Sequence, residues 1–179
     1  MADTAEGQTR TAISAAMQQS VGSELSRMVS YPVSESDIRK WALAVYYPEE
    51  PPARFWDEEA AASSRQGGIV APEDFNPFAW LRAHPKGWSR SSAATDADST
   101  ERSLGIDGPH LVNQLNGGVS VEYGEPIRPG DVITSVTRLG QYREREGSLG
   151  LMLLTPMETT WTNQRDEMVK RSTLVLIRY

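Results

Sequence analysis

The sequence predicts an α+β domain in which an antiparallel sheet wraps a central helix. In the first half of the chain, Ile38, Trp41 and Ala42 lie at helical spacing and form one apolar face. In the second half, Val119 and Val121 alternate with polar residues, which is typical of a strand. Helices followed by an antiparallel series of strands are the order expected for the α+β class.

Residues 1–21 are expected to form a mobile N-terminal arm or a loosely docked helix, because they are rich in Ala, Ser, Thr and Gln, although Ile13, Ala16 and Met17 could line one helical stripe. A single folded domain is expected over residues 22–179. A chain of this length can bury a core without disulfides or a structural metal.

Three elements are expected ahead of the central helix. Alternation of apolar and polar residues predicts a strand over 24–33. Ser34 and the acidic residues after it resemble a capping box, and the helix that they start must end before Pro48. A shorter helix is expected to begin with Asp57 as its cap and to end at Gly67-Gly68.

The central helix is predicted over residues 72–83, the most apolar stretch of the first half, which contains Phe75 and Phe78. Proline is tolerated in the first turn of such a helix. Residues 84–105 show no periodicity and predict a long loop.

Strand-like segments follow from Leu111 to the end of the chain, separated by turns such as Arg128-Pro129-Gly130-Asp131 and Asn163-Gln164-Arg165-Asp166. Charges that alternate in sign over 143–146 indicate an exposed strand or hairpin. With the strand at 24–33, a five- or six-stranded antiparallel sheet is expected. The remaining segments are 119–123, 132–139, 149–155, 157–162 and 169–178.

The composition argues against several functional classes. The chain has no cysteine, which excludes disulfides, thiolate zinc sites and cysteine nucleophiles and suits a cytoplasmic location. A net charge of −6 argues against a nucleic-acid partner. No apolar run approaches the roughly 20 residues that span a bilayer, and residues 1–6 lack the features of a secretory signal, so neither a membrane partner nor export is expected. No histidine pair has metal-ligand spacing, and no metal or cofactor is expected.

Three segments in this order resemble the N-terminal domain of MaoC-like dehydratases, a family of FAS1-like dehydratase and enoyl-CoA hydratase type. They are residues 33–42, Phe55-Trp56-Asp57 with Gly68-Ile69-Val70-Ala71-Pro72, and the turn at 123–131, Tyr-Gly-Glu-Pro-Ile-Arg-Pro-Gly-Asp. The resemblance covers roughly residues 22–179. It implies a hot-dog fold and hydration or dehydration of an enoyl thioester by acid–base catalysis with an oxyanion hole.

The resemblance also implies that this chain lacks the catalytic dyad. Catalytic members hold a water molecule between an Asp and a His five positions apart. When Asp57 and the segment 68–72 are laid on the family pattern, Glu50 takes the carboxylate position and Phe55 takes the imidazole position. Because Phe cannot transfer a proton, the leading interpretation is a non-catalytic subunit of a heteromeric (R)-specific enoyl-CoA hydratase or 3-hydroxyacyl thioester dehydratase.

The expected partners are an acyl-CoA or acyl-thioester substrate and a hot-dog subunit that contains the Asp and His. Side-by-side pairing would cover an open sheet edge, so a homodimer is expected when the chain is alone. The residues expected to shape the substrate groove, or else to be ordinary core and helix-end positions, are Phe55, Gly68, Ile69, Val70, Pro72 and Phe75.

Two alternatives stay open. A self-sufficient homodimeric hydratase would use Glu50 or Asp107 with His110, which Asp107 could orient. Acidic residues between prolines are more typical of an exposed turn, however, and His110 and His84 both fall in or beside the long loop. The second alternative is a thioester-binding module without catalysis.

Overall fold

The computed structural model describes residues 11–79, 81, 96–148 and 150–179. One antiparallel sheet contains all six strands, and most helices lie in the chain between its first strand and the other five, which confirms the α+β class. No helix within these ranges is long and apolar enough to cross a membrane. The elements are α1 (Ala15–Gln19), β1 (Glu24–Val29), α2 (Glu35–Tyr46), the 3-10 turn η1 (Ala53–Phe55), α3 (Glu58–Ala62), α5 (Ser99–Ser103), β2 (Gln114–Tyr123), β3 (Thr134–Leu139), β4 (Arg143–Gly147), β5 (Gly150–Thr162) and β6 (Met168–Arg178).

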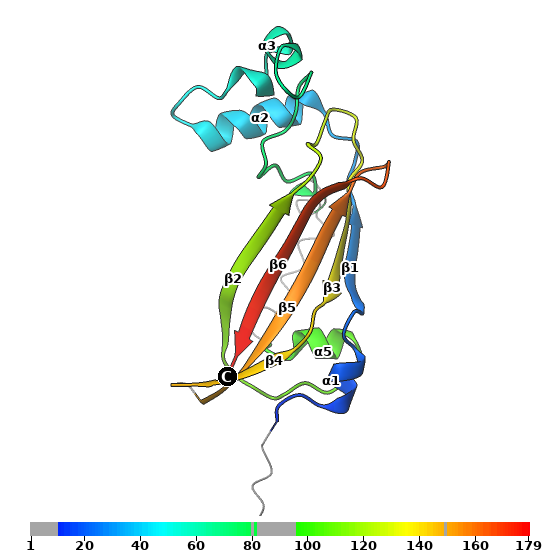
Figure 1. Ribbon diagram of the computed structural model, residues 1–179, viewed down its shortest axis with the longest axis vertical. Coiled ribbons are helices and arrows are strands. Elements are labelled where there is room, and N and C mark those ends of the chain that lie inside the picture. Colours follow the sequence, from blue (N-terminus) through cyan, green and yellow to red (C-terminus); the bar gives the residue numbers. More distant parts are fainter. Residues whose placement is uncertain (1–10, 80, 82–95, 149) are drawn as a thin grey trace, which may run out of the picture.

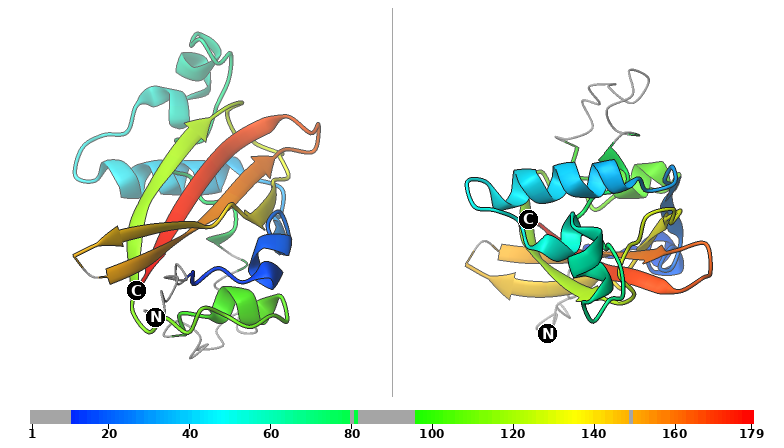
Figure 2. Two further views of the ribbon diagram at one scale, coloured as in Figure 1. Left: turned by 60° about the horizontal axis from the view of Figure 1, so that its bottom comes forward. Right: turned by 90° about the horizontal axis from the view of Figure 1, so that it is seen from above.

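The strands form one antiparallel sheet in the order β1-β3-β5-β6-β2, and β4 pairs with the first part of β5. This confirms the expected sheet, to which the N-terminal half contributes β1. Helices α2 and α3 gather at one end of the sheet, and α1 and α5 lie at the other (Figure 1). Figure 2 shows the hairpin of β4 and β5 extending beyond the other strands, and α2 running across the end of the sheet.

Strand β5 is continuous where the sequence predicts two strands, at 149–155 and 157–162. Pro156 separates the two predicted segments. On one side of β5, β3 ends opposite Met157 and β4 begins opposite Leu154. The proline, which has no amide donor, is therefore accommodated at the gap between two neighbouring strands.

Helix α2 begins where the sequence predicts. The Ser34 hydroxyl accepts a hydrogen bond from the Asp37 amide at 3.1 Å, and acidic side chains occupy the first turn. Ile38 and Ala42 are fully buried on one face of the helix. The helix ends before Pro48, as expected.

Replacing Ser34 by alanine is expected to lower the free energy of unfolding by about 1 kcal/mol, because the Asp37 amide loses its acceptor. Urea unfolding followed by circular dichroism measures this change. The matched control is Ser36→Ala, at an exposed position in the same helical turn. Equal effects of the two substitutions would argue against the capping role.

Two boundaries in the segment after α2 differ from the prediction. Helix α3 starts at its expected cap, where the Asp57 carboxylate accepts from the Ala60 amide at 2.8 Å. It ends at Ala62 instead of at Gly67-Gly68. The Ser64 hydroxyl donates to the Ala61 carbonyl and replaces the next helical hydrogen bond.

The helix expected over 72–83 does not begin as predicted. Residues 73–78 are turns or irregular, and the Asn76 side chain accepts a backbone hydrogen bond there. Pro77 offers no amide donor and disfavours helical geometry in the residue before it. Helical geometry first appears at Ala79, and the rest of the predicted helix lies largely outside the described residues.

In the N-terminal segment the structure has a docked helix, one of the two arrangements expected for residues 1–21, and not a mobile arm throughout. Residues 1–10 lie outside the described part of the chain. Residues 15–19 form α1, and Met17 is 1% exposed and belongs to a buried cluster with Leu139 and Leu153. Helix α1 therefore packs on the domain, because the Met17 side chain is buried in the core beside the sheet.

The largest buried cluster lies between α2, the segment 69–78 and the sheet. Its members come from five separate parts of the chain, so it joins the N-terminal helices to the strands. The cluster consists of Val33, Ile38, Ala61, Ile69, Ala71, Phe75, Phe78, Ile127, Ile133 and Val169.

A buried ion pair fastens α5 to the opposite end of the sheet. Arg178 of β6 is 1% exposed and Glu101 of α5 is fully buried. The Arg178 guanidinium donates to both Glu101 oxygens at 2.7 Å and to the Thr155 hydroxyl at 2.8 Å. The Tyr142 hydroxyl donates to Glu101 at 2.6 Å.

The network shifts the titration of its members. Burial acts to raise the pKa of Glu101, but the hydrogen bonds from Arg178 and Tyr142 and the charge of Arg178 outweigh it, so this pKa lies below its ordinary value of 4.5. Burial, followed by the Glu101 carboxylate, raises the pKa of Tyr142. Glu101 is therefore a buried carboxylate, and its charge depends on Arg178.

Candidate functional site

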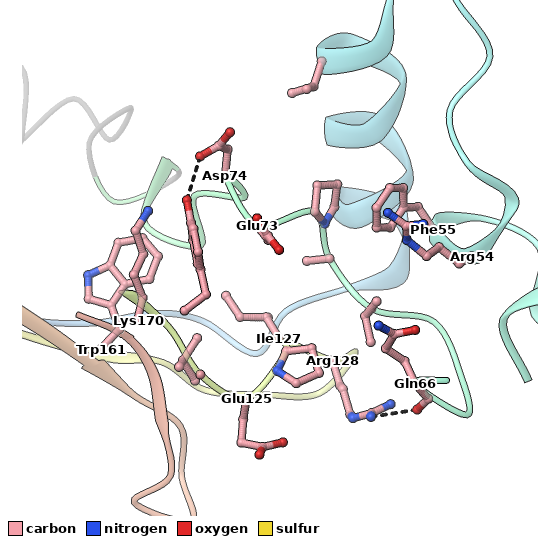
Figure 3. A pocket seen from close by; sticks show the side chains of 18 of the residues that line it. Arg54, Phe55, Gln66, Glu73, Asp74, Glu125, Ile127, Arg128, Trp161 and Lys170 are labelled. Carbon is pink, nitrogen blue, oxygen red and sulfur yellow. Dashed lines mark hydrogen bonds between the residues drawn. The ribbon is translucent and has the colours of Figure 1, made fainter. Parts of the chain in front are cut away.

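A cavity of about 630 Å³ lies beside the end of the sheet nearest α2 (Figure 3). This volume is in the range of small-molecule sites. The walls come from the end of α2, η1, the segment after α3, the turn after β2, and strands β5 and β6. The lining residues are Val45, Tyr46, Arg54, Phe55, Arg65, Gln66, Val70, Ala71, Pro72, Glu73, Asp74, Tyr123, Gly124, Glu125, Pro126, Ile127, Arg128, Trp161, Val169 and Lys170.

The Arg-Pro-Gly-Asp turn positions an arginine in this cavity. The Asp131 carboxylate is buried and accepts from the Arg128 amide at 2.8 Å. Gly130 has a φ of +87°, a left-handed conformation that favours glycine. The Arg128 guanidinium donates to the Gln66 carbonyl at 2.8 Å. The turn therefore ties the loop that contains Gln66 to the edge of the cavity.

Aromatic and polar groups meet on another side of the cavity. The Tyr123 hydroxyl donates to Oδ1 of Asp74 at 3.2 Å (Figure 3). Burial raises the pKa of Tyr123 above its ordinary value, and the Asp74 and Glu73 carboxylates raise it further. Nζ of Lys170 lies 5.3 Å from the centre of the Tyr123 ring and 4.9 Å from that of Trp161.

Phe55 forms an apolar wall of the cavity. Its side chain is buried in a cluster with Ala42 and Val70, and its ring centre lies 5.9 Å from that of Tyr46. The Arg54 guanidinium lies 4.5 Å from the centre of the Phe55 ring. This wall can hold an apolar or cationic group, but its ring cannot exchange a proton.

The residues that the sequence suggests for the substrate groove divide between the cavity and the core. Phe55, Val70 and Pro72 line the cavity. Ile69 and Phe75 are buried in the largest cluster instead. Gly68 does not line the cavity, although a Cβ built on it would lie 3.8 Å from the Arg128 guanidinium.

The catalytic candidates from the sequence are not brought together in the cavity. Glu50 lies in a separate groove, and Asp107 is exposed. Nδ1 of His110 lies 3.2 Å from Oδ2 of Asp98, and the His110 amide donates to the same oxygen. The expectation that Asp107 orients His110 is therefore wrong, because the loop after α5 returns His110 to the start of that helix. His84 lies outside the described residues.

Several polar cavity residues were missed by the sequence analysis. Tyr123 and Arg128 lie within the turn at 123–131 that carries the family resemblance. That resemblance could therefore have identified them as candidate site residues. Arg54 and Asp74 each lie one position from a residue that the sequence suggests for the groove, Phe55 and Phe75. Lys170 occupies an ordinary strand position, and nothing in its sequence context marks it.

The arrangement suits binding of a partly apolar ligand with an anionic group. Cationic, aromatic and carboxylate side chains share the walls, and among the described residues no histidine lines the cavity. Within the ranges that the structure describes, no group of three or more His, Cys, Asp or Glu side chains could hold a metal ion.

Several solved structures share this fold. The MaoC-like dehydratase from Rhodospirillum rubrum is 25% identical over 89% of this chain and 92% of its own, with a TM-score of 0.52. The ChsH1-ChsH2 complex from Mycobacterium tuberculosis is 17% identical over 92% of this chain and 88% of the matched one, with a TM-score of 0.60. The HadBC complex of the same organism, a 3R-hydroxyacyl-ACP dehydratase, is 18% identical over 88% and 99%, with a TM-score of 0.51.

Sequence comparison identifies the family. No curated protein sequence matches the chain significantly. A family model described as FAS1-like, dehydratase domain region matches residues 19–172, which include α2, the cavity and nearly the whole sheet. The match and the shared architecture confirm the resemblance and the hot-dog fold that it implies. This chain belongs to the FAS1-like dehydratase domain family of MaoC-like hot-dog proteins.

Proposed function

We propose that this chain is a non-catalytic, groove-forming subunit of a heteromeric (R)-specific enoyl-CoA hydratase or 3-hydroxyacyl thioester dehydratase. The main support is Phe55, which takes the imidazole position in the family pattern. Its ring is 4% exposed and forms a wall of the cavity. A phenyl ring there can neither remove a proton from water nor return one to the substrate.

The other ionisable groups also support a missing dyad. His110 is held by Asp98 and does not line the cavity, and Glu50 lies in a separate groove. General acid–base hydration needs both partners within hydrogen-bond reach of one water molecule. A partner chain with an intact Asp and His would supply them.

The exposed edge of the sheet supports a partner subunit. Strand β2 pairs with β6 on one side, and all ten of its residues are exposed. Val119 and Val121 are 58% and 42% exposed, which is unusual for valines in the middle of a strand. Tyr123 at the end of β2 also lines the cavity, so a chain docked on this edge would lie beside the cavity.

The proposal includes the class of partner and its substrate. Two of the similar structures are described as complexes, ChsH1-ChsH2 and HadBC. By analogy, the partner of this chain is a hot-dog subunit with the Asp and His, and the substrate is an acyl-CoA or another acyl thioester. The cysteine-free composition is compatible with work in the cytoplasm.

The test is hydration of crotonyl-CoA, followed as loss of the absorbance of its conjugated enoyl thioester. The chain alone is expected to show no turnover above buffer. Addition of a dyad-bearing hot-dog partner is expected to raise the rate by at least about a hundredfold, the size of a general acid–base contribution. The control is His110→Ala in the reconstituted pair, which is expected to leave the rate of crotonyl-CoA hydration unchanged.

One observation favours a second candidate, a self-sufficient homodimeric hydratase. Asp74 and Tyr123 form a hydrogen-bonded carboxylate and hydroxyl pair inside the cavity. In that case the chain alone would turn over crotonyl-CoA, and Asp74→Asn would abolish the activity. Turnover that His110→Ala abolishes would point to a site at α5 instead. If the complex of this chain with its partner subunit binds the thioester without turnover, the chain is a binding module.

A further inference from the structure

We infer that the free edge of strand β4 is closed to a second copy of this chain and fits an extended segment of another chain whose charges alternate in the opposite order. The alternating run Arg143, Glu144, Arg145, Glu146 forms this strand. β4 pairs with β5 alone, and in the described part of the chain its backbone has no hydrogen bond outside the β4–β5 hairpin. Figure 2 shows the hairpin extending beyond the other strands, where a further strand has access.

The charges of β4 are not compensated within the described part of the chain. None of the four belongs to an ion pair there. Glu144 accepts hydrogen bonds from the Thr11 hydroxyl and the Ala12 amide, which are both uncharged. The residues opposite them on β5 are apolar, namely Leu151, Met152, Leu153 and Leu154. The charges therefore remain available to a strand that pairs with the free edge.

The two signs of charge are separated between the two faces of the hairpin. Successive side chains of a strand point to opposite faces, so Arg143 and Arg145 lie on one face and Glu144 and Glu146 on the other. Glu144 is partly buried and the other three are exposed. A strand added to this edge meets only positive charge on one face and only negative charge on the other.

The geometry of an antiparallel sheet decides which residues of two β4 strands would lie opposite each other. Only every second residue of an edge strand directs its N–H and C=O groups outward, and such residues must face each other in the ladder. In the full-overlap register, Arg145 lies opposite Arg145 of the second copy, and Glu144 lies opposite Glu146. A shift of two residues brings Arg143 opposite Arg145 in one direction and Glu146 opposite Glu146 in the other.

Each of these registers places equal charges directly opposite each other, which destabilises a pair of strands. The edge therefore repels its own copy, although its outward backbone groups are unpaired. Opposite charges in the same places stabilise the pair. A strand with acidic residues opposite the two arginines and basic residues opposite the two glutamates satisfies both the backbone and the side chains of β4. The partner that fits is thus an extended segment with a different sequence.

The test compares pairing between identical chains with pairing between chains of opposite charge order. Both chains contain Val119→Lys and Val121→Lys, which place like charges on β2 and are expected to remove pairing there. The first chain keeps β4 unchanged. The second has the same composition and net charge, because it exchanges the residues of β4 through Arg143→Glu, Glu144→Arg, Arg145→Glu and Glu146→Arg. Sedimentation equilibrium from micromolar to millimolar concentration measures each chain alone and their equimolar mixture.

The mixture is expected to associate and the separate chains are not. Either chain alone brings equal charges together, whereas in the mixture opposite charges meet in the same registers. The dissociation constant of the mixed dimer should be at least about tenfold lower than that of either homodimer. Added salt should raise it, because the charge pairs are exposed to solvent and screened. If the lysine background still dimerises through another surface, a larger mass of the mixture than of either chain gives the same result.

A second variant keeps Glu144 and its contacts with residues 11–12, and it covers the case in which the exchanged chain does not fold. In Arg145→Thr with Glu146→Arg, Glu144 faces the arginine introduced at position 146 twice in the full-overlap register. No equal charges remain opposite each other there. This variant is expected to dimerise in the same lysine background, whereas Arg145→Thr alone should stay monomeric. Circular dichroism checks the fold of each chain.

The control for position exchanges a charge pair on the other free strand of that side. Glu24→Arg with Arg27→Glu reverses an exposed ion pair of β1, and its mixture with the first chain should not associate. A mixture of the β4 chains that associates no more strongly than its components would overturn the proposal. Pairing through β4 between unchanged chains would overturn it as well. Neither outcome depends on turnover or on thioester binding, so the proposed function is tested separately.

Discussion

Replacing Arg178 by methionine is expected to lower the free energy of unfolding by about 3–5 kcal/mol. The substitution leaves the fully buried Glu101 carboxylate without the guanidinium that donates to both of its oxygens. Methionine retains most of the unbranched apolar stem, so the loss reports the missing charge more than a cavity. Urea unfolding monitored by circular dichroism gives the value.

Two further variants separate the buried charge from other effects. Arg27→Met removes the partner of Glu24 in an exposed ion pair, where a much smaller loss is expected because water replaces the partner. The double variant Glu101→Leu with Arg178→Met removes both charges and should be more stable than Arg178→Met alone. A loss for Arg178→Met no larger than that for Arg27→Met would contradict the role of the network.

The same network predicts how stability depends on pH, which provides a second readout. Because the pKa of Glu101 is lower in the folded state than its ordinary value of 4.5, its contribution is fully present above that value. It is lost as the pH falls through the lowered pKa. Urea unfolding of the wild type and of Glu101→Gln between about pH 3 and pH 6 is therefore expected to show a shallower decline for the variant.

Placing two lysines on the exposed edge strand is expected to abolish pairing with a second chain. The wild type alone should be a dimer at micromolar concentration, since β2 leaves a full edge and its valines exposed. In Val119→Lys with Val121→Lys, like charges would meet across the interface. We expect the dimer dissociation constant to rise on the order of a hundredfold or more. Light scattering and sedimentation equilibrium measure this change.

The opposite edge of the sheet provides the matched control. Ser26→Lys places a positive charge at an exposed position of β1, which pairs with β3 alone, and should leave the dimer intact. The far-ultraviolet circular dichroism spectrum of the double lysine variant should match that of the wild type, because both valines are exposed and the fold of each chain does not depend on them. A wild-type chain that is monomeric, or a dimer that survives both lysines and dissociates with Ser26→Lys, would exclude β2 as the interface.

The agreement between prediction and structure is best where neighbouring residues decide the conformation. Ser34 and Asp57 cap helices at the expected positions because each hydrogen bond joins residues only three positions apart. The turn at 163–166 follows from side chains that bond to nearby amides, as Asn163 does with the Arg165 amide. Strand alternation likewise depends on residues two positions apart.

Prediction fails where a distant segment decides the outcome. Pro156 is tolerated inside β5 because β3 and β4 leave a gap beside it. Met17 is buried because Leu139 and Leu153 lie next to it in the fold. Neither fact can be inferred from the residues that surround Pro156 or Met17 in the sequence.

The α+β class and the family resemblance follow from the order and identity of residues, and the prediction that Phe55 takes the imidazole position rests on the same pattern. The membership of the cavity does not, because Tyr123 and Asp74 are 49 positions apart and meet only when the turn after β2 packs beside the segment after α3. The partner of His110 is Asp98 rather than Asp107 for the same reason. The sequence determines which side chains are charged. The distances between the charged groups, and therefore the strength of their interactions, depend on how the helices pack against the sheet.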